Sequence, residues 1–326
     1  MENRTRRLRG NDILRRMTRE TRLSADALVY PLFVREGHGI VEELPSLPGQ
    51  IRYSPDTLPG GVDEALKAGV RSLLLFGVPG TKDDTGSGAY DENGVVQQAV
   101  RSIRKSFGKD VCLITDVCLC EYTSHGHCGL VENEKVDNDS TLPLLAETAL
   151  SHVRAGCDIP APSGMMDGTV AYLRAALDAE GFTDTPIMSY AAKYASAFYG
   201  PFRDAACSAP RFGDRKTYQM DYHSIRQALR RIQTDTDEGA DIIIVKPALS
   251  YLDVVSKARE TIKLPVAAYS VSGEYAMIKA AAASGLIDEY SVMCESAVGV
   301  FRAGADILIS YFAKELVGAI RNGDIG

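Results

Sequence analysis

A repeated junction between helix and strand most constrains the fold of this chain. Near residues 67–76, 154–159, 238–245 and 302–309, a helix-forming segment ends at a glycine that leads into an apolar run. Glycine just past a helix end is a common C-terminal cap, and a continuous apolar run indicates a strand that is buried on both faces. Buried strands separated by helices predict a parallel sheet.

Eight such strands are expected along the chain. They lie at residues 28–34, 72–78, 111–116, 157–161, 186–190, 242–245, 266–269 and 307–310. Helices are expected near 62–69, 94–107, 142–155, 169–180, 223–238, 252–261, 274–285, 291–303 and 312–321. Eight strand–helix units predict an α/β fold, a (β/α)8 TIM barrel over residues 26–326. A doubly wound open sheet is the alternative, but no Gly-x-Gly-x-x-Gly follows the first strand.

Composition narrows the class of protein. The chain has 326 residues, 45% of them hydrophobic and 24% charged, which is ordinary for a globular protein. A net charge of -7 argues against nucleic-acid binding. No apolar run approaches ~18 residues and no signal-peptide core is visible, so we expect no membrane span and a cytoplasmic location. Seven cysteines suit a reducing compartment better than a disulfide framework.

The first 25 residues form an extended N-terminal arm that differs from the rest of the chain. Residues 1–22 contain eight arginines and few large apolar side chains. Such a segment can bind nucleic acid, target the protein or lie on an acidic neighbouring subunit. The interspersed acidic residues and the acidic body favour the third alternative, so we predict an oligomerisation arm.

A cysteine-rich segment follows the third expected strand. Cys118, Cys120 and Cys128 lie within thirteen positions, together with Asp116 and two histidines. Three thiolates are a preferred zinc environment, and three ligands leave one position open for water or substrate, as in catalytic sites. His127 could instead close a structural site, and three idle thiols are a further alternative.

The barrel hypothesis places further polar residues at the same mouth, because active sites of such barrels lie at the carboxyl ends of the strands. The residues at or just beyond strand ends are Asp116, Ser163, Lys193, Lys246, Ser272 and Tyr311. Burial, mutual repulsion and a nearby cation would lower the pKa of Lys193 and Lys246, and a neutral amine attacks ketones to form a Schiff base. Snorkelling of either lysine into solvent is the alternative. One lysine indicates an aldolase, and two indicate two carbonyl substrates.

A segment without clear periodicity, at about residues 197–222, exceeds an ordinary barrel loop and predicts an active-site lid. Arg203 and Arg215 within it could clamp a carboxylate, and the neighbouring aromatic residues Phe198 and Tyr199 could exclude water. A solvated charged loop is the alternative.

These motifs together resemble the porphobilinogen synthase family, also called δ-aminolevulinate dehydratase. The most specific segments are Cys118-Leu-Cys with Thr123-Ser-His-Gly-His-Cys-Gly, Phe198-Tyr-Gly-Pro-Phe-Arg, Val245-Lys-Pro and Val271-Ser-Gly-Glu. The resemblance implies condensation of two molecules of 5-aminolevulinate to porphobilinogen with loss of two waters, in tetrapyrrole synthesis. It also implies a homo-oligomer, usually an octamer of arm-exchanging dimers.

The resemblance also assigns roles to residues. It implies that Lys246 holds the first substrate as a Schiff base, whose carboxylate meets Ser272 and Tyr311. Lys193 would engage the second substrate. The remaining assignments are a carboxylate clamp of Arg203, Arg215 and Gln219, zinc on Cys118, Cys120 and Cys128, and proton transfer or amine orientation by Asp116 and Ser163.

Three departures from the family pattern stand out. Arg231 aligns with the position where many bacterial members carry a carboxylate for an allosteric magnesium, so such a Mg²⁺ site is doubtful here, unless the alignment slips by one helical turn. Gly164 replaces a common aspartate and Glu121 a common proline, both near the site. The retained cysteines indicate the zinc-dependent branch of the family. A Schiff-base aldolase and a noncatalytic zinc-holding scaffold remain the alternative functions.

Overall fold

The computed structural model describes residues 3–326, so Met1 and Glu2 of the predicted arm lie outside the described residues. Eight parallel strands run side by side in the order β8-β5-β4-β1-β12-β11-β10-β9. Their bounds are β1 Leu28–Arg35, β4 Ser72–Val78, β5 Cys112–Val117, β8 Ile159–Pro162, β9 Met188–Lys193, β10 Ile242–Lys246, β11 Val266–Ser270 and β12 Ile307–Ser310. Each corresponds to a predicted strand.

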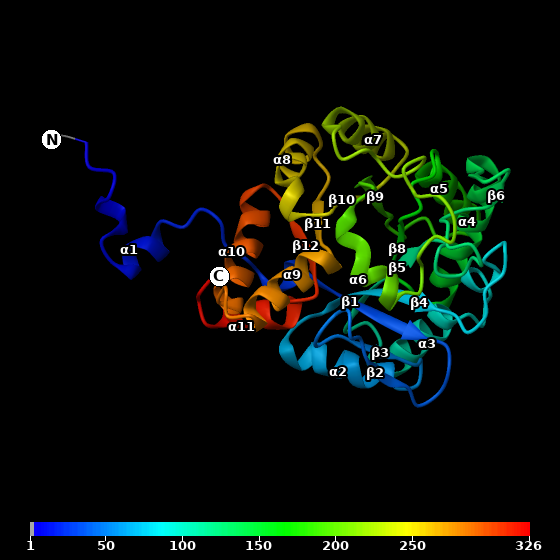
Figure 1. Ribbon diagram of the computed structural model, residues 1–326, viewed down its shortest axis with the longest axis horizontal. Coiled ribbons are helices and arrows are strands. Elements are labelled where there is room, and N and C mark those ends of the chain that lie inside the picture. Colours follow the sequence, from blue (N-terminus) through cyan, green and yellow to red (C-terminus); the bar gives the residue numbers. More distant parts are fainter. Residues whose placement is uncertain (1–2) are drawn as a thin grey trace.

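The strands form a nearly closed barrel that helices surround (Figure 1). β8 and β9 lie next to each other, but within residues 3–326 no hydrogen-bonded ladder joins them. The helices are α2 Leu58–Ala68, α3 Val95–Phe107, α4 Asn138–Ala155, α5 Thr169–Ala179, α7 Ile225–Asp237, α8 Leu252–Thr261, α9 Ser272–Ala283, α10 Glu289–Arg302 and α11 Ala313–Arg321. The predicted α/β barrel is therefore confirmed.

The glycines of the repeated junction adopt the backbone conformation that the cap requires. Gly69, Gly156, Gly239 and Gly304 follow α2, α4, α7 and α10, and their φ angles are 103°, 110°, 100° and 112°. Side chains disfavour this left-handed region, whereas glycine adopts it readily. Each helix thus stops where the next buried strand must begin.

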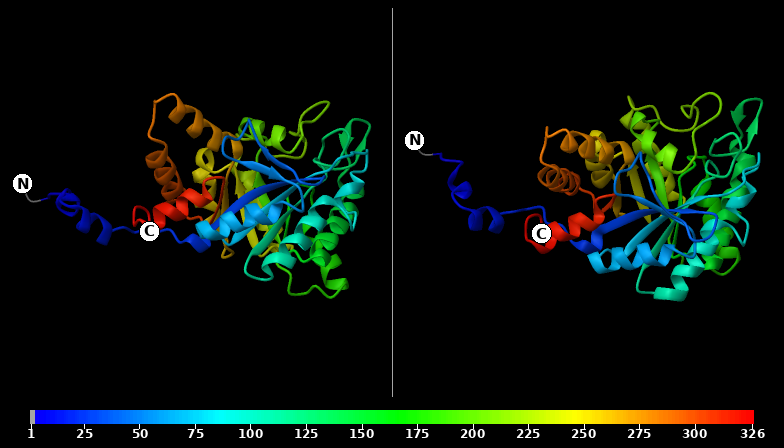
Figure 2. Two further views of the ribbon diagram at one scale, coloured as in Figure 1. Left: turned by 90° about the horizontal axis from the view of Figure 1, so that it is seen from below. Right: turned by 60° about the horizontal axis from the view of Figure 1, so that its bottom comes forward.

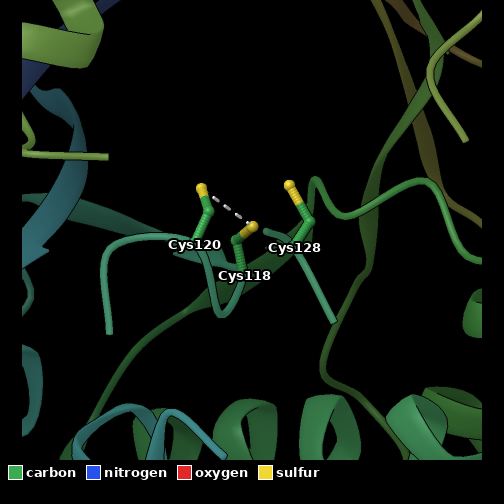
Figure 3. A group of neighbouring side chains, drawn as sticks. All are labelled: Cys118, Cys120 and Cys128. Carbon is green, nitrogen blue, oxygen red and sulfur yellow. Dashed lines mark hydrogen bonds between the residues drawn. The ribbon is translucent and has the colours of Figure 1, made fainter. Parts of the chain in front are cut away.

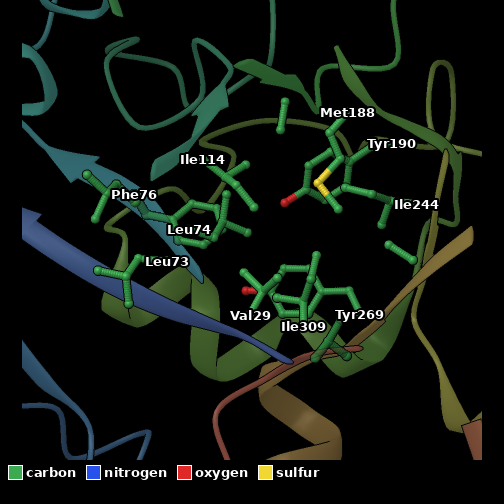
Figure 4. Packing of buried hydrophobic residues seen from close by; sticks show 14 of the residues in the cluster. Val29, Leu73, Leu74, Phe76, Ile114, Met188, Tyr190, Ile244, Tyr269 and Ile309 are labelled. Atoms are coloured by element: carbon green, nitrogen blue, oxygen red, sulfur yellow. The ribbon is translucent and has the colours of Figure 1, made fainter. Parts of the chain in front are cut away.

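Apolar side chains fill the interior of the barrel. Figure 4 shows Val29, Ile114, Tyr190, Ile244 and Ile309, from five different strands, converging on the axis. All are almost completely buried. The packed interior leaves the carboxyl ends of the strands as the place where polar groups can gather.

Short elements decorate the barrel and were not predicted. They are α1 Asp12–Met17, β2 Val41–Glu43, β3 Ile51–Tyr53, β6 Val131–Glu132, β7 Lys135–Val136 and α6 Gly200–Ala205. The predicted lid thus contains a helix of six residues, α6, after a single 3-10 turn at Ala197–Tyr199. Segments this short contain too few residues to show a period.

The arm, which contains α1, extends away from the barrel (Figures 1 and 2). Its larger apolar side chains, Leu8, Ile13 and Met17, are exposed. Arg19 donates to the Gly323 carbonyl at the root of the arm. Among the described residues, no helix is both long and apolar enough to cross a membrane.

Candidate active site

The carboxyl ends of the strands surround a cavity of only about 10 Å³. It is lined by Asp116, Ser163, Lys193, Lys246, Cys120, Glu121, Arg203, Arg215, Phe76, Tyr199 and Phe202. Strand-end residues and both lid arginines therefore meet, as the barrel hypothesis predicts. Ser272 and Tyr311 are not among the residues that line this cavity; the Tyr311 hydroxyl is 3.3 Å from that of Tyr269.

The three predicted zinc cysteines converge. Their Sγ atoms all lie within 4.8 Å of one another, and those of Cys118 and Cys120 are 3.4 Å apart (Figure 3). All three are buried. The pKa of Cys128 lies well below its usual range, because its thiolate accepts hydrogen bonds from Cys118 and Cys120. Three buried sulfurs at this spacing fit a thiophilic cation such as Zn²⁺.

A tight turn returns the chain so that Cys128 can join the pair. The Thr123 hydroxyl donates to the His127 carbonyl at 2.9 Å, and Gly126 has a φ of 74°. A Cβ at Gly126 would lie 2.4 Å from the Ala209 carbonyl oxygen, in the lid. The glycine therefore lets the cysteine loop and the lid approach each other.

His127 is not grouped with the three cysteines. Its Nδ1 lies 3.0 Å from the Tyr218 hydroxyl and its Nε2 lies 3.1 Å from the Phe212 carbonyl. Both partners belong to the lid. The structure therefore gives no support to His127 as a ligand that closes a structural site.

Lys246 and Lys193 are cross-strand neighbours at the ends of β10 and β9. The Nζ atom of Lys246 lies 4.4 Å from the ring centre of Tyr269 and 5.1 Å from those of Tyr199 and Phe202. Burial first, and then repulsion by Lys193, lower the pKa of Lys246 to about 7. A large fraction of this amine is therefore neutral at physiological pH, as predicted.

With no cation on the cysteines, the pKa of Lys193 shifts in the direction opposite to the one predicted with a cation beside it. Burial acts to lower its pKa, but the negative field of Cys128, Cys118 and Asp116 outweighs burial and raises it. Its Nζ donates to the Ser163 carbonyl at 2.6 Å. This bond spans the gap between β8 and β9, where the sheet has no ladder. Neither lysine snorkels, since both are buried.

Three lid residues have buried side-chain polar atoms without a hydrogen-bond partner among the described residues. These atoms are Nε of Arg203, Nε of Arg215, and the amide nitrogen and oxygen of Gln219. Arg215 is fixed by two bonds from Nη2, to the carbonyls of Gly126 and Ser208. Burial and the charge of Arg215 both lower the pKa of Arg203. Unpaired buried donors beside two repelling cations call for an anion.

Comparisons of this chain with known proteins, by sequence and by structure, point to one family. Residues 2–319 match the family described as delta-aminolevulinic acid dehydratase. The delta-aminolevulinic acid dehydratase of Halalkalibacterium halodurans is 55% identical over 313 residues, covering 96% of this chain and 95% of the relative. That of Archaeoglobus fulgidus is 54% identical over 313 residues, covering 96% of each.

A solved structure of the same family has the same fold. The dehydratase of Toxoplasma gondii ME49, in complex with the reaction product porphobilinogen, superposes with a TM-score of 0.95 at 43% identity. The match covers 98% of this chain and 91% of that one. The chain belongs to the delta-aminolevulinic acid dehydratase family. It is a 5-aminolevulinate dehydratase, a hydro-lyase of tetrapyrrole biosynthesis, and the predicted family and activity are confirmed.

Two departures from the dehydratase pattern can now be located. The Glu121 carboxylate lies in the cavity and accepts a hydrogen bond from the Cys120 thiol at 3.2 Å. Burial first, and then the nearby Cys128, raise the pKa of Glu121. Gly164 lies against Cys128, where a Cβ would be 3.4 Å from the Cys128 carbonyl. Both departures therefore adjoin the cysteine trio.

Sequence reasoning missed several residues of this dehydratase site. Tyr190 and Tyr269 flank Lys246, and the buried Tyr190 hydroxyl has no hydrogen-bond partner among the described residues. Phe76 and Phe202 form part of the cavity wall. In an apolar strand, an aromatic side chain that faces a site cannot be told by sequence pattern from one that fills the core. The only sequence signal was the polar hydroxyl that each tyrosine brings into an otherwise apolar strand.

Proposed function

We propose that Lys246 forms the Schiff base with the first 5-aminolevulinate and that Lys193 engages the second. The observation that carries this assignment is the buried aromatic pocket around the Lys246 amine, whose pKa is lowered to about 7, beside the cross-strand neighbour Lys193. The neutral Lys246 amine attacks the substrate ketone and releases one water as the C=N bond forms. Ser272 and Tyr311 would receive the carboxylate of that substrate.

Arg203, Arg215 and Gln219 would clamp the carboxylate of the second substrate. Their unpaired buried atoms support this role, because a carboxylate would satisfy donors that otherwise have no partner. Tyr199 lines the cavity, and Phe198 precedes it in the same 3-10 turn, so both would exclude water there. The clamp and the aromatic pocket of Lys246 thus distinguish two identical substrate molecules by their surroundings.

Cys118, Cys120 and Cys128 would hold Zn²⁺, which supplies Lewis acidity and orientation at the second substrate. Asp116 is placed to move a proton, because burial first, and then the nearby Glu121, raise its pKa to about 7. A carboxyl group that titrates near neutrality both accepts and donates protons. Ser163 follows β8 beside both lysines and would orient the amine.

The first test mixes the purified protein with 5-aminolevulinate and follows the pyrrole colorimetrically, with and without a zinc chelator. Pyrrole that chelation stops and zinc restores supports the substrate, the reaction and the metal together. Pyrrole that resists chelation contradicts the zinc role. Borohydride reduction followed by peptide mass spectrometry should place the trapped substrate on Lys246, and trapping on Lys193 alone would reverse the assignment.

We also propose that the arm joins subunits into an octamer of arm-exchanging dimers, the assembly that is usual in the family. The exposed Leu8, Ile13 and Met17 support this role, since an arm that packs on nothing exposes them. Deletion of residues 1–22 should reduce the mass measured by light scattering. An unchanged mass would assign the arm another role.

A further inference from the structure

The first turn of α9 touches two separate parts of the active site. The Ser272 hydroxyl accepts a hydrogen bond from the Phe202 amide at 3.0 Å and donates to the Phe198 carbonyl at 3.3 Å. Both partners lie in the lid, at the 3-10 turn and at α6. One face of this turn is therefore bonded to the lid backbone.

Gly273 brings the lid closer than any other residue could. A Cβ at this position would lie 2.5 Å from the Phe198 carbonyl oxygen and 2.8 Å from its Cα. These are backbone atoms, so they cannot yield as a flexible side chain would. The lid can take its place only because residue 273 has no side chain.

Glu274 holds the other part, the loop that follows Lys246 (residues 247–251). Its Oε1 accepts from the Leu249 amide at 2.5 Å, and its Oε2 accepts from the amides of Ala248 and Val271 at 3.4 and 2.6 Å. The side chain is 1% exposed. One buried carboxylate therefore joins the Lys246 loop to the start of α9.

A third contact closes the circuit between these parts. The Tyr199 hydroxyl, from the lid, donates to the Lys246 carbonyl at 3.2 Å. The lid, residues 246–251 and the first turn of α9 are thus each hydrogen-bonded to the other two. A displacement of one member must break contacts with both of the others.

We propose that the first turn of α9 is a clamp that keeps the lid and the Schiff-base lysine in one register, with Gly273 and Glu274 as positioning residues. The inference rests on the proposed role of Lys246. Occupation of the Lys246 pocket and closure of the lid would then be coupled through Ser272, which would meet the first substrate, and through Gly273 and Glu274, which touch neither substrate. Such a clamp would let the first bound substrate promote the ordering of the lid that clamps the second.

The contact between α9 and the loop after Lys246 is tested by Glu274→Gln. The amide keeps the shape but places an NH₂ group against backbone N–H donors. We expect borohydride trapping at Lys246 to slow by about 10-fold and KM to rise, because small displacements of a reacting group are costly. Asp288→Asn is the matched control: Asp288 caps the neighbouring α10 by accepting from the Ser291 amide, away from the site. Equal effects of the two variants would overturn the proposal.

The contact between α9 and the lid is tested by Gly273→Ala. Gly318→Ala in α11 is the control, because a Cβ at Gly318 would meet nothing within 4 Å. Arg211 and Lys216 are exposed trypsin sites in the lid. We expect Gly273→Ala to speed cleavage there by about 5-fold or more and to weaken the protection that substrate gives. Lid cleavage at the wild-type rate would contradict the proposal.

A measurement on the unaltered protein keeps the proposal testable if a variant fails to fold. Addition of 5-aminolevulinate should slow hydrogen exchange in residues 198–206 and 247–251 together. Protection of one segment without the other would refute the coupling. Failure of the proposed function is distinguishable, because it would appear as absence of trapping at Lys246 in the wild-type protein.

Discussion

Lys193 and Lys246 differ more than their positions suggest. They end adjacent strands and are paired across the sheet, yet one lies beside thiols and a carboxylate and the other among four aromatic rings. The pKa of Lys246 falls to about 7, whereas that of Lys193 rises. The immediate surroundings, and not the strand position, therefore decide which amine is free to attack a ketone.

The difference suits an enzyme that must treat two copies of one substrate unequally. A neutral lysine in an apolar pocket can form a covalent bond, while a charged lysine beside the cysteine trio can orient or donate a proton. If both amines had the same pKa, nothing in the lysine pair would set the order of reaction. The following predictions test this inequality, beginning with the largest expected effect.

Lys246→Met should abolish pyrrole formation, with a loss in kcat of at least about 10⁴-fold, because the covalent nucleophile is removed. Colorimetric assay and light scattering together measure turnover and assembly. Lys314→Met is the control, since the Lys314 Nζ also lies over an aromatic ring, 5.2 Å from the centre of Tyr30, but outside the site. Residual turnover close to wild type would assign the attack to Lys193 instead.

Cys120→Ala should lower zinc content and reduce activity by about 10² to 10³-fold, because two thiolates hold the cation poorly. Metal analysis and the pyrrole assay measure the two effects. Cys294→Ala provides the comparison, since Cys294 is also buried but lies in α10. Trapping at Lys246 should persist in Cys120→Ala, which separates the two halves of the site. Loss of trapping as well would show that the lysines are not independent of the metal.

The rate of trapping at Lys246 should rise with pH through about 7 and then level off. The pKa of this amine is depressed in the folded protein, so the reactive neutral form accumulates above that value. Lys193→Met removes a repulsive charge and should move the midpoint to higher pH. Cyanoborohydride trapping between about pH 5.5 and 9 measures both curves. An unchanged midpoint would mean that Lys193 does not act on Lys246.

Much of this site could be predicted from the sequence because the barrel topology determines where the residues at the strand ends lie. Glycine caps mark where strands begin, and parallel strands put Asp116, Lys193 and Lys246 at one end whatever their distance along the chain. The sign of the pKa shift of Lys193 could not be predicted. It depends on distances to three thiols and a carboxylate that the sequence does not contain.

The remaining misses have physical reasons as well. Tyr190 and Tyr269 look like core residues in strands that are buried on both faces, and α6 is too short to have a visible period. Glu274 belongs to a recognised motif, but its bonds run to backbone amides of another loop. Partners of this kind leave no trace in side-chain identity.

The smallest expected effect concerns magnesium. The Arg231 guanidinium bonds to Asp235 at 2.5 Å, to Asp167 at 2.7 Å and to the Met166 carbonyl at 2.7 Å. Asp235 is fully buried, and a buried carboxylate needs a counter-charge, which Arg231 already provides. Added Mg²⁺ should therefore change kcat by less than about 2-fold, since no uncompensated carboxylate remains at this position. Calorimetric titration and the pyrrole assay test this directly. Strong activation by Mg²⁺ would mean that a cation bound elsewhere contributes to the difference between the pKa values of Lys193 and Lys246. That difference would then not come from the side chains of the protein alone.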